Sequence, residues 1–151
     1  MNKVYIAAAG IPIPAWKNEV RAFAAAVLRE LSIEDWELSI LLCDDPFIAE
    51  LNGRYRGVQK PTDVLSFPQE GQPGGPAPGQ AHPAGDVVIS LATLRRNAAR
   101  LGQPAETELK RLLIHGILHL RGLDHPPAGD GGMLELQERV LQRVQEKKIG
   151  I

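Results

Sequence analysis

One stretch of eleven residues, 115–125, limits most strongly what this chain can fold into. It holds three of the four histidines of the chain, His115, His119 and His125, in the spacing H-x3-H-x5-H. Residues four apart lie on one face of an α-helix, so His115 and His119 would present their imidazole rings one turn apart. Apolar residues at helical spacing predict that this segment is a helix with a buried face: Leu109, Leu112, Leu113, Ile117 and Leu120.

Gly122 is the predicted end of this helix, because glycine adopts a left-handed conformation at little cost. The chain can then turn and bring His125 back toward the other two rings, and the two prolines that follow prevent the helix from resuming. Three neutral imidazoles directed at one point suit a borderline metal such as zinc, with a fourth position open. We predict one zinc ion per chain, bound by His115, His119 and His125. The alternative is two core histidines and one loop histidine.

The histidine and glycine spacing matches the long zinc-protease motif H-E-x-x-H-x-x-G-x-x-H, with one difference. Gly116 stands where that motif has glutamate, and the glutamate is the general base of the peptidase. A zinc peptidase-like hydrolase therefore remains an alternative that lacks its main catalytic group.

Three blocks of sequence resemble the YbeY family of bacterial rRNA maturation factors. Residues 115–125 match H-G-x-L-H-L-x-G-x-D-H, residues 51–68 match L-N-x-x-Y-R…P-T-x-V-L-S-F-P, and residues 85–90 match G-D-[IV]-x-I-S. The blocks occur in family order, and the resemblance covers most of the chain from about residue 36.

The resemblance implies a small mixed sheet packed with helices, and a zinc-dependent endoribonuclease that acts on single-stranded RNA. It also implies maturation of ribosomal RNA, chiefly the 3′ end of the small-subunit RNA, and a part in ribosome quality control. The expected partners are the small ribosomal subunit and assembly factors. A non-catalytic ribosome-assembly factor with a structural metal is a second alternative.

Two further residues are candidates for catalysis. Arg56 follows a tyrosine at the end of a predicted helix, and an arginine can bind phosphate oxygens through two parallel hydrogen bonds as charge develops. The resemblance implies the same role for Arg56. The alternative is that Arg56 pairs with an acid or caps its helix. Asp124 is next to His125 and would either orient a metal-bound histidine or act as a general base. Ser66 and Asp63 are weaker candidates for lining the same groove.

Composition and charge set broader limits. A chain of 151 residues with a single cysteine, Cys43, is one domain without an internal disulfide, and we expect a cytoplasmic protein. The apolar start of the chain is too short for a signal peptide, and no apolar run could span a membrane. The net charge of −1 does not indicate a nucleic-acid binder, but residues 52–125 hold nine Lys and Arg against six Asp and Glu. That excess is either a basic surface for RNA or ordinary solvated charge.

Periodicity and turn residues predict an α+β (mixed α/β) domain over residues 1–151, in the order βαβαββααα with a four-stranded mixed sheet. The predicted strands are 3–8, 36–43, 64–67 and 86–90. The predicted helices are 16–31, 45–55, 91–101, 104–122 and 133–148. Residues 69–84, rich in proline and glycine, are predicted to form a loop that contains His82, and residues 129–132 a turn.

Overall fold

The computed structural model describes residues 1–69, 81–122 and 131–151, and within them the predicted order of elements is confirmed. The strands are β1 (Lys3–Ala9), β2 (Trp36–Cys43), β3 (Val64–Pro68) and β4 (His82–Ser90). The helices are α1 (Lys17–Glu30), α2 (Asp45–Arg56), α3 (Leu91–Leu101), α4 (Ala105–Leu120) and α5 (Gly131–Val144).

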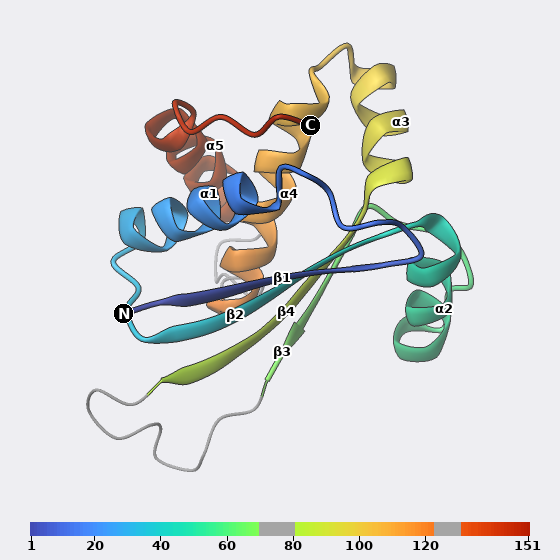
Figure 1. Ribbon diagram of the computed structural model, residues 1–151, viewed down its shortest axis with the longest axis horizontal. Helices are drawn as coiled ribbons and strands as arrows, with labels where there is room; N and C mark the ends of the chain where they lie inside the picture. The colour runs from blue at the N-terminus through green and yellow to red at the C-terminus, as the bar shows by residue number, and fades with distance from the viewer. Residues whose placement is uncertain (70–80, 123–130) are drawn as a thin grey trace.

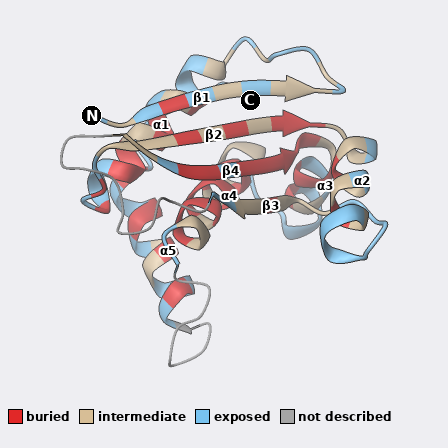
Figure 2. Cartoon of the chain, turned by 90° about the horizontal axis from the view of Figure 1, so that it is seen from below, coloured by how far each residue is buried: buried red, intermediate tan, exposed pale blue. Residues whose placement is uncertain are grey.

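The four strands form one mixed sheet in the order β1-β2-β4-β3. β1, β2 and β4 run parallel, while β3 pairs with β4 in the antiparallel direction and occupies an edge of the sheet. The central strands β2 and β4 carry most of the buried positions of the sheet, as the red segments of Figure 2 show. A functional site on this sheet is therefore expected at an edge or an end, where side chains remain accessible.

One face of the sheet is covered by α1, α3, α4 and α5, which lie together on the same side in Figure 1. Their apolar faces pack against alternate residues of the central strands, for example Leu38, Ile40 and Val87. Full burial of one such side chain stabilises the fold by about 1.5–3 kcal/mol. In the described part of the chain no helix combines the length and the apolarity needed to cross a membrane.

Among the described elements, α2 covers the opposite face of the sheet at one end (Figure 1). Ile48 of α2 packs there against Cys43, Leu65 and Val88, which form a second, smaller core. Burial, followed by the nearby carboxylates of Asp44 and Asp45, raises the pKa of Cys43 to about 12. The thiol is thus neutral and inert at neutral pH, as expected of a buried structural cysteine.

Two predicted boundaries are wrong because long-range contacts decide them. β4 begins at His82 rather than Asp86, since pairing with β2 from Trp36 onward draws part of the predicted loop into the sheet. The last helix begins at Gly131 and ends at Val144, four residues before the predicted end, because the chain then folds back so that the Ile149 N–H bonds Glu106. The rest of the predicted turn, residues 129–130, lies outside the described residues.

Candidate active site

The C-terminal turn of α4 brings His115 and His119 together as their spacing predicts. Their Nε2 atoms lie 2.8 Å apart, the ring centroids 4.3 Å apart, and both side chains are half-buried. The helix ends at Leu120, and Gly122 adopts a left-handed φ of 91° while its N–H bonds the carbonyl of His119 at 3.0 Å. The predicted end of the helix is therefore confirmed, and its last turn is closed directly behind the two histidines.

A pocket of about 600 Å³ opens beside this pair. Three elements contribute to it: the end of α2, the whole of edge strand β3, and α4. α4 packs on one face of the sheet and α2 on the other, and residues of both helices line the pocket along edge strand β3. The lining residues are Tyr55, Arg56, Val64, Leu65, Ser66, Phe67, Pro68, His115 and His119.

Arg56 is the last residue of α2 and is exposed in this pocket. Gly57 ends the helix with a left-handed φ of 73°, so the backbone turns away and leaves the arginine at the pocket wall. Among the described residues no acid pairs with Arg56, whereas Arg54 on the same helix bonds Glu50 at 2.9 Å. The structure therefore brings Arg56 and the histidine pair into one pocket without a competing carboxylate from the described part of the chain.

Tyr55 is a pocket residue that the sequence analysis did not identify. The residue is 61% exposed, and its ring packs edge-on against Phe67 of β3, with the centroids 5.1 Å apart. Phe67 thus supports the tyrosine, which remains largely exposed at the pocket. The signal available in the sequence was its place in the block of residues 51–68, directly before Arg56, and both residues line the pocket.

Gly116 explains why the protease glutamate is missing. A Cβ atom at this position would lie 2.6 Å from Val87 Cγ1, 2.9 Å from Val87 Cγ2 and 3.3 Å from Ser66 Oγ. Val87 is fully buried and β-branched, so it cannot move aside cheaply. α4 therefore lies too close to the sheet for a glutamate at position 116, and the peptidase general base has no place in this fold.

Gln137 on α5 is a second residue that the sequence analysis missed. It is only 8% exposed, and its Oε1 lies 3.0 Å from Nδ1 of His115. A signal was present, because Gln137 falls on the same helical stripe as the buried Met133, Val140 and Val144. A polar residue on an apolar stripe needs a hydrogen-bond partner.

A carboxylate–guanidinium pair flanks this contact. The Arg111 Nη2 and Nε atoms of α4 donate to Glu138 Oε1 and Oε2 of α5, both at 3.0 Å. The hydrogen bond from Arg111 lowers the pKa of Glu138, burial opposes this, and a hydrogen bond from the Gln137 side chain lowers it further. Glu138 is therefore a carboxylate at neutral pH and accepts hydrogen bonds only.

The residues present fit a metal such as zinc as far as they are described. Two imidazole Nε2 atoms converge at the pocket, and Gln137 bonds the other ring nitrogen of His115, as the partners of metal-bound histidines commonly do. Within the described ranges, no further His, Cys, Asp or Glu joins these two histidines in a group of three that could hold a metal ion. The predicted third ligand His125 and the neighbouring Asp124 lie outside the described residues, so the three-histidine site stays a prediction.

Of the two further residues predicted to line the pocket, Ser66 and Asp63, only one does so. Ser66 lines the pocket, as expected, but Asp63 does not appear in its wall and instead accepts the Val64 N–H at 2.8 Å. His82 does not line the pocket either. It lies at the start of β4 with its ring 6.5 Å from that of Trp36.

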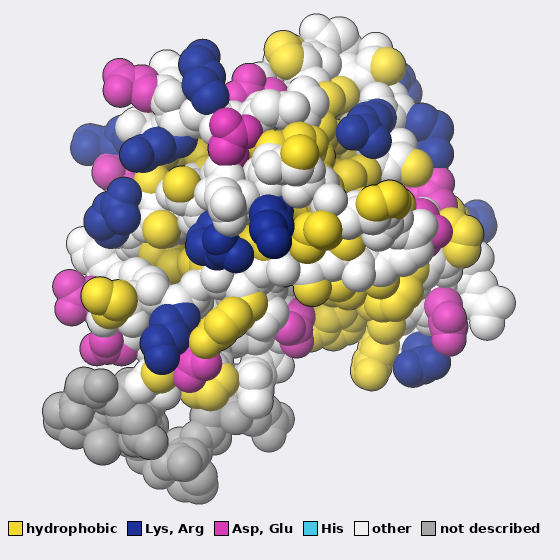
Figure 3. Space-filling model, in the orientation of Figure 1, with side chains coloured by type: hydrophobic (Ala, Val, Ile, Leu, Met, Phe, Trp, Pro, Cys, Tyr) yellow, Lys and Arg dark blue, Asp and Glu magenta, His cyan; other side chains and the backbone are white. Residues whose placement is uncertain are grey.

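The charge of the surface gives little support to a broad basic patch on the one face drawn in Figure 3. There the Lys and Arg side chains are spread among Asp and Glu side chains over the whole face. This face therefore does not supply the basic surface that the charge count allowed, whereas Arg56 places a single cation at the pocket.

Fold and site together define a small mixed α/β protein with a histidine–arginine pocket at the edge strand of its sheet. Comparison with known proteins then gives the family: residues 6–145 match the family described as Endoribonuclease YbeY, and the chain belongs to this family. The resemblance predicted from the three sequence blocks is confirmed.

Named relatives and a solved structure agree with this assignment. The chain is 46% identical to Endoribonuclease YbeY of Treponema pallidum over 142 residues, which cover 93% of this chain and 89% of the relative. It is 42% identical to Endoribonuclease YbeY of Aquifex aeolicus over 132 residues, 86% of this chain and 85% of the relative. A Thermotoga maritima protein solved in solution has the same fold, with a TM-score of 0.66 and 25% identity over 95% of this chain and 89% of that one.

Proposed function

We propose that this chain is a zinc-dependent endoribonuclease that cuts single-stranded RNA. Its relatives carry the name endoribonuclease, and the convergence of His115, His119 and Arg56 on one pocket is the observation that supports the same activity here. His125 completes the metal site in this proposal, with one zinc ion per chain.

The metal ligands, Arg56, Tyr55 and Asp124 each have a task in the proposed cleavage. Zinc, when bound, supplies Lewis-acid polarisation of the phosphodiester and a nucleophile at neutral pH. Arg56 binds the equatorial phosphate oxygens and stabilises the charge that develops on them. Tyr55 stacks on a base next to the scissile phosphate, which a splayed single strand offers and a paired duplex does not. Asp124 either orients a histidine or accepts a proton.

Peptide hydrolysis fits this pocket less well. The packing of Gly116 against Val87 and Ser66 excludes the glutamate that peptidases with this histidine spacing use. The cationic Arg56 in the pocket is instead suited to an anionic substrate.

In the cell, the proposed substrate is ribosomal RNA, chiefly the 3′ end of the small-subunit RNA. The small ribosomal subunit and assembly factors are the proposed partners, with a part in ribosome quality control in the cytoplasm. Family membership supports this proposal.

The decisive experiment is cleavage of a labelled single-stranded RNA by identically purified wild type, His119→Ala, Arg56→Ala and Arg54→Ala, with and without a chelator. We expect the wild type and Arg54→Ala to cut, chelation and His119→Ala to abolish cutting, and Arg56→Ala to cut far more slowly. Arg54 is the matched control, because it lies on the same helix but pairs with Glu50.

Three outcomes would contradict the proposal. Equal cutting by every preparation would reveal a contaminating nuclease. Cutting of peptides but not RNA would favour the peptidase. Zinc bound at one per chain without any turnover would favour a non-catalytic assembly factor.

A further inference from the structure

Gln137 makes a buried polar contact that the proposed chemistry has not used. Its side chain extends from α5 to Nδ1 of His115, which is the ring nitrogen that does not contact His119. With 8% of the residue exposed, solvent cannot replace this hydrogen bond, so an imidazole without it would leave a buried polar atom unsatisfied.

The contact with His115 shows which way the Gln137 amide points. Its oxygen Oε1 is the atom that faces the ring, 3.0 Å from Nδ1 of His115. Since a carbonyl oxygen accepts, Nδ1 of His115 must carry the proton, and the lone pair of the neutral ring must lie on Nε2.

Arg111 makes a second polar contact between the two helices. It precedes His115 by one turn on α4 and holds Glu138 of α5 through a guanidinium fork, with a third contact of 3.2 Å from Nε to Oε1. Because Glu138 follows Gln137 on α5, the fork holds α5 against α4 next to the contact between Gln137 and His115.

We propose that Gln137 is a positioning residue that holds His115 in the Nδ1–H form, so that its Nε2 lone pair faces His119 and is available to a divalent transition metal. This rests on the metal site of the proposed function. Because the ring is already oriented before the metal arrives, binding does not have to order it, and metal affinity rises accordingly.

The test uses Gln137→Leu, Gln137→Glu and Gln142→Leu. Leucine fills similar space without an acceptor, and glutamate keeps an oxygen that can accept from Nδ1. Gln142 is exposed on the same helix and serves as the control. The readouts are zinc affinity by competition with a chromogenic chelator, and the His115 tautomer from ring nitrogen shifts of the full chain after metal removal.

We expect Gln137→Leu to bind zinc roughly 10- to 100-fold more weakly and to lose the uniform Nδ1–H form of His115. Gln137→Glu should keep that form and bind within a few-fold of wild type, as should Gln142→Leu. Wild-type tautomer and affinity in Gln137→Leu would overturn the proposal. So would equal losses in the leucine and glutamate variants, which would mean that Gln137 only supports the packing of α5.

Failure of this inference can be told apart from failure of the metal site. If wild type binds no zinc, the metal assignment falls, whereas the tautomer of His115 still decides whether Gln137 positions the ring.

Discussion

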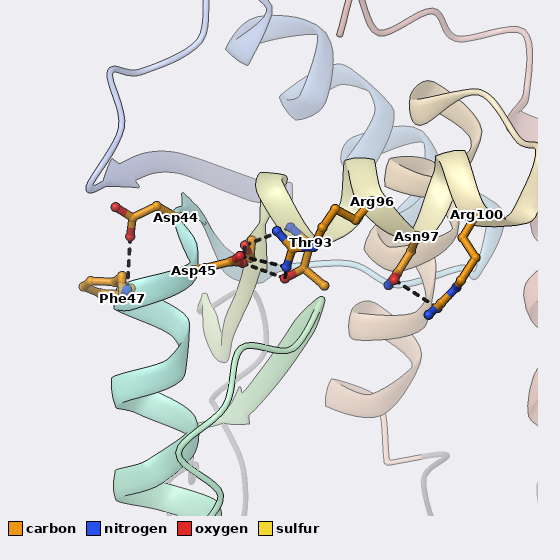
Figure 4. A network of polar contacts seen from close by, with 8 residues as sticks. Asp44, Asp45, Phe47, Thr93, Arg96, Asn97 and Arg100 are labelled. Carbon is orange, nitrogen blue, oxygen red and sulfur yellow. Dashed lines mark hydrogen bonds and ion pairs between the residues drawn. The ribbon is translucent and has the colours of Figure 1, made fainter.

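The two ends of α2 carry charges of opposite sign: Asp45 and Arg56 are its first and last residues, and only Asp45 has bonding partners in the described part of the chain. At its start, Asp44 accepts the Phe47 N–H at 3.0 Å, and Asp45 accepts the hydroxyls of Ser90 and Thr93, both at 2.6 Å. Arg96 pairs with the second oxygen of Asp45 at 2.8 Å, as the dashed lines of Figure 4 follow from α2 to α3. At its end, Arg56 enters the pocket with no acid beside it in the described part of the chain.

This difference separates polar groups that hold the fold from polar groups that remain available to a ligand. Every oxygen of Asp45 has a partner from α3 or its cap, so the start of α2 anchors the helix to the sheet end. The end of α2 gains only the favourable placement of a cation near a helix C-terminus. Four predictions would break or sharpen this contrast.

The largest effect is expected from Arg56→Ala. Loss of a donor that stabilises developing charge should slow RNA cleavage roughly 100- to 1000-fold, while the free energy of unfolding changes by less than about 0.5 kcal/mol. Arg96→Ala should behave in the opposite way, with unchanged cleavage and a small loss of about 0.2–1 kcal/mol. Single-turnover cleavage and urea unfolding of both variants test this. If Arg56→Ala is destabilised but fully active, Arg56 stabilises the fold and does not act in cleavage.

Asp45→Ala should give the next effect, on stability alone. The change removes the acceptor of two hydroxyls and one guanidinium, and hydrogen bonds to a charged group contribute about 1.5–3 kcal/mol. We expect the free energy of unfolding to fall by about 2–3 kcal/mol in urea titrations. The cleavage rate per folded molecule should remain that of wild type, and a slower rate at full stability would contradict the assigned role.

Tyr55→Ala should weaken RNA binding without changing the fold. Stacking of a base on an aromatic ring contributes about 1–3 kcal/mol, so KM should rise more than kcat falls. Tyr5→Ala is the matched control, because Tyr5 is 50% exposed on edge strand β1 and does not line the pocket. Tyr55→Phe should retain binding. If Tyr5→Ala and Tyr55→Ala weaken binding equally, the pocket does not stack a base.

The smallest effect is the pH dependence of the Asp45 network. Burial raises the pKa of Asp45, but the hydrogen bonds from Ser90 and Thr93 and the Arg96 charge outweigh it and lower the pKa overall. A lowered pKa in the folded state means stability that is present above the unfolded value of about 3.9 and is lost as the pH falls through the folded pKa. The difference in unfolding free energy between wild type and Asp45→Asn should therefore be constant near neutral pH and shrink below about pH 4.

Local features of this chain could be predicted from its sequence. The described strands and helices occur in the predicted order, and Gly122 follows the end of α4, as its residue type predicts. The i, i+4 spacing alone was enough to place His115 and His119 together, since a helix fixes that geometry within one turn.

Contacts between distant segments could not be predicted from the sequence. The start of β4 depended on its register with β2, and the end of α5 depended on contacts from Lys110 and Glu106 to residues 145 and 149. Gln137 and Tyr55 reached the site only because α5 packs on α4 and α2 packs on β3.

By itself, the sequence determined the histidine pair, the helix that carries it and the family to which the chain belongs. Only the tertiary structure decided that Arg56 shares a pocket with that pair, that Gln137 holds one of its rings, and that position 116 has no room for a side chain. The reason is physical: periodicity and capping act within a few residues of the chain, whereas the walls of the pocket come from elements that meet only when both faces of the sheet are packed.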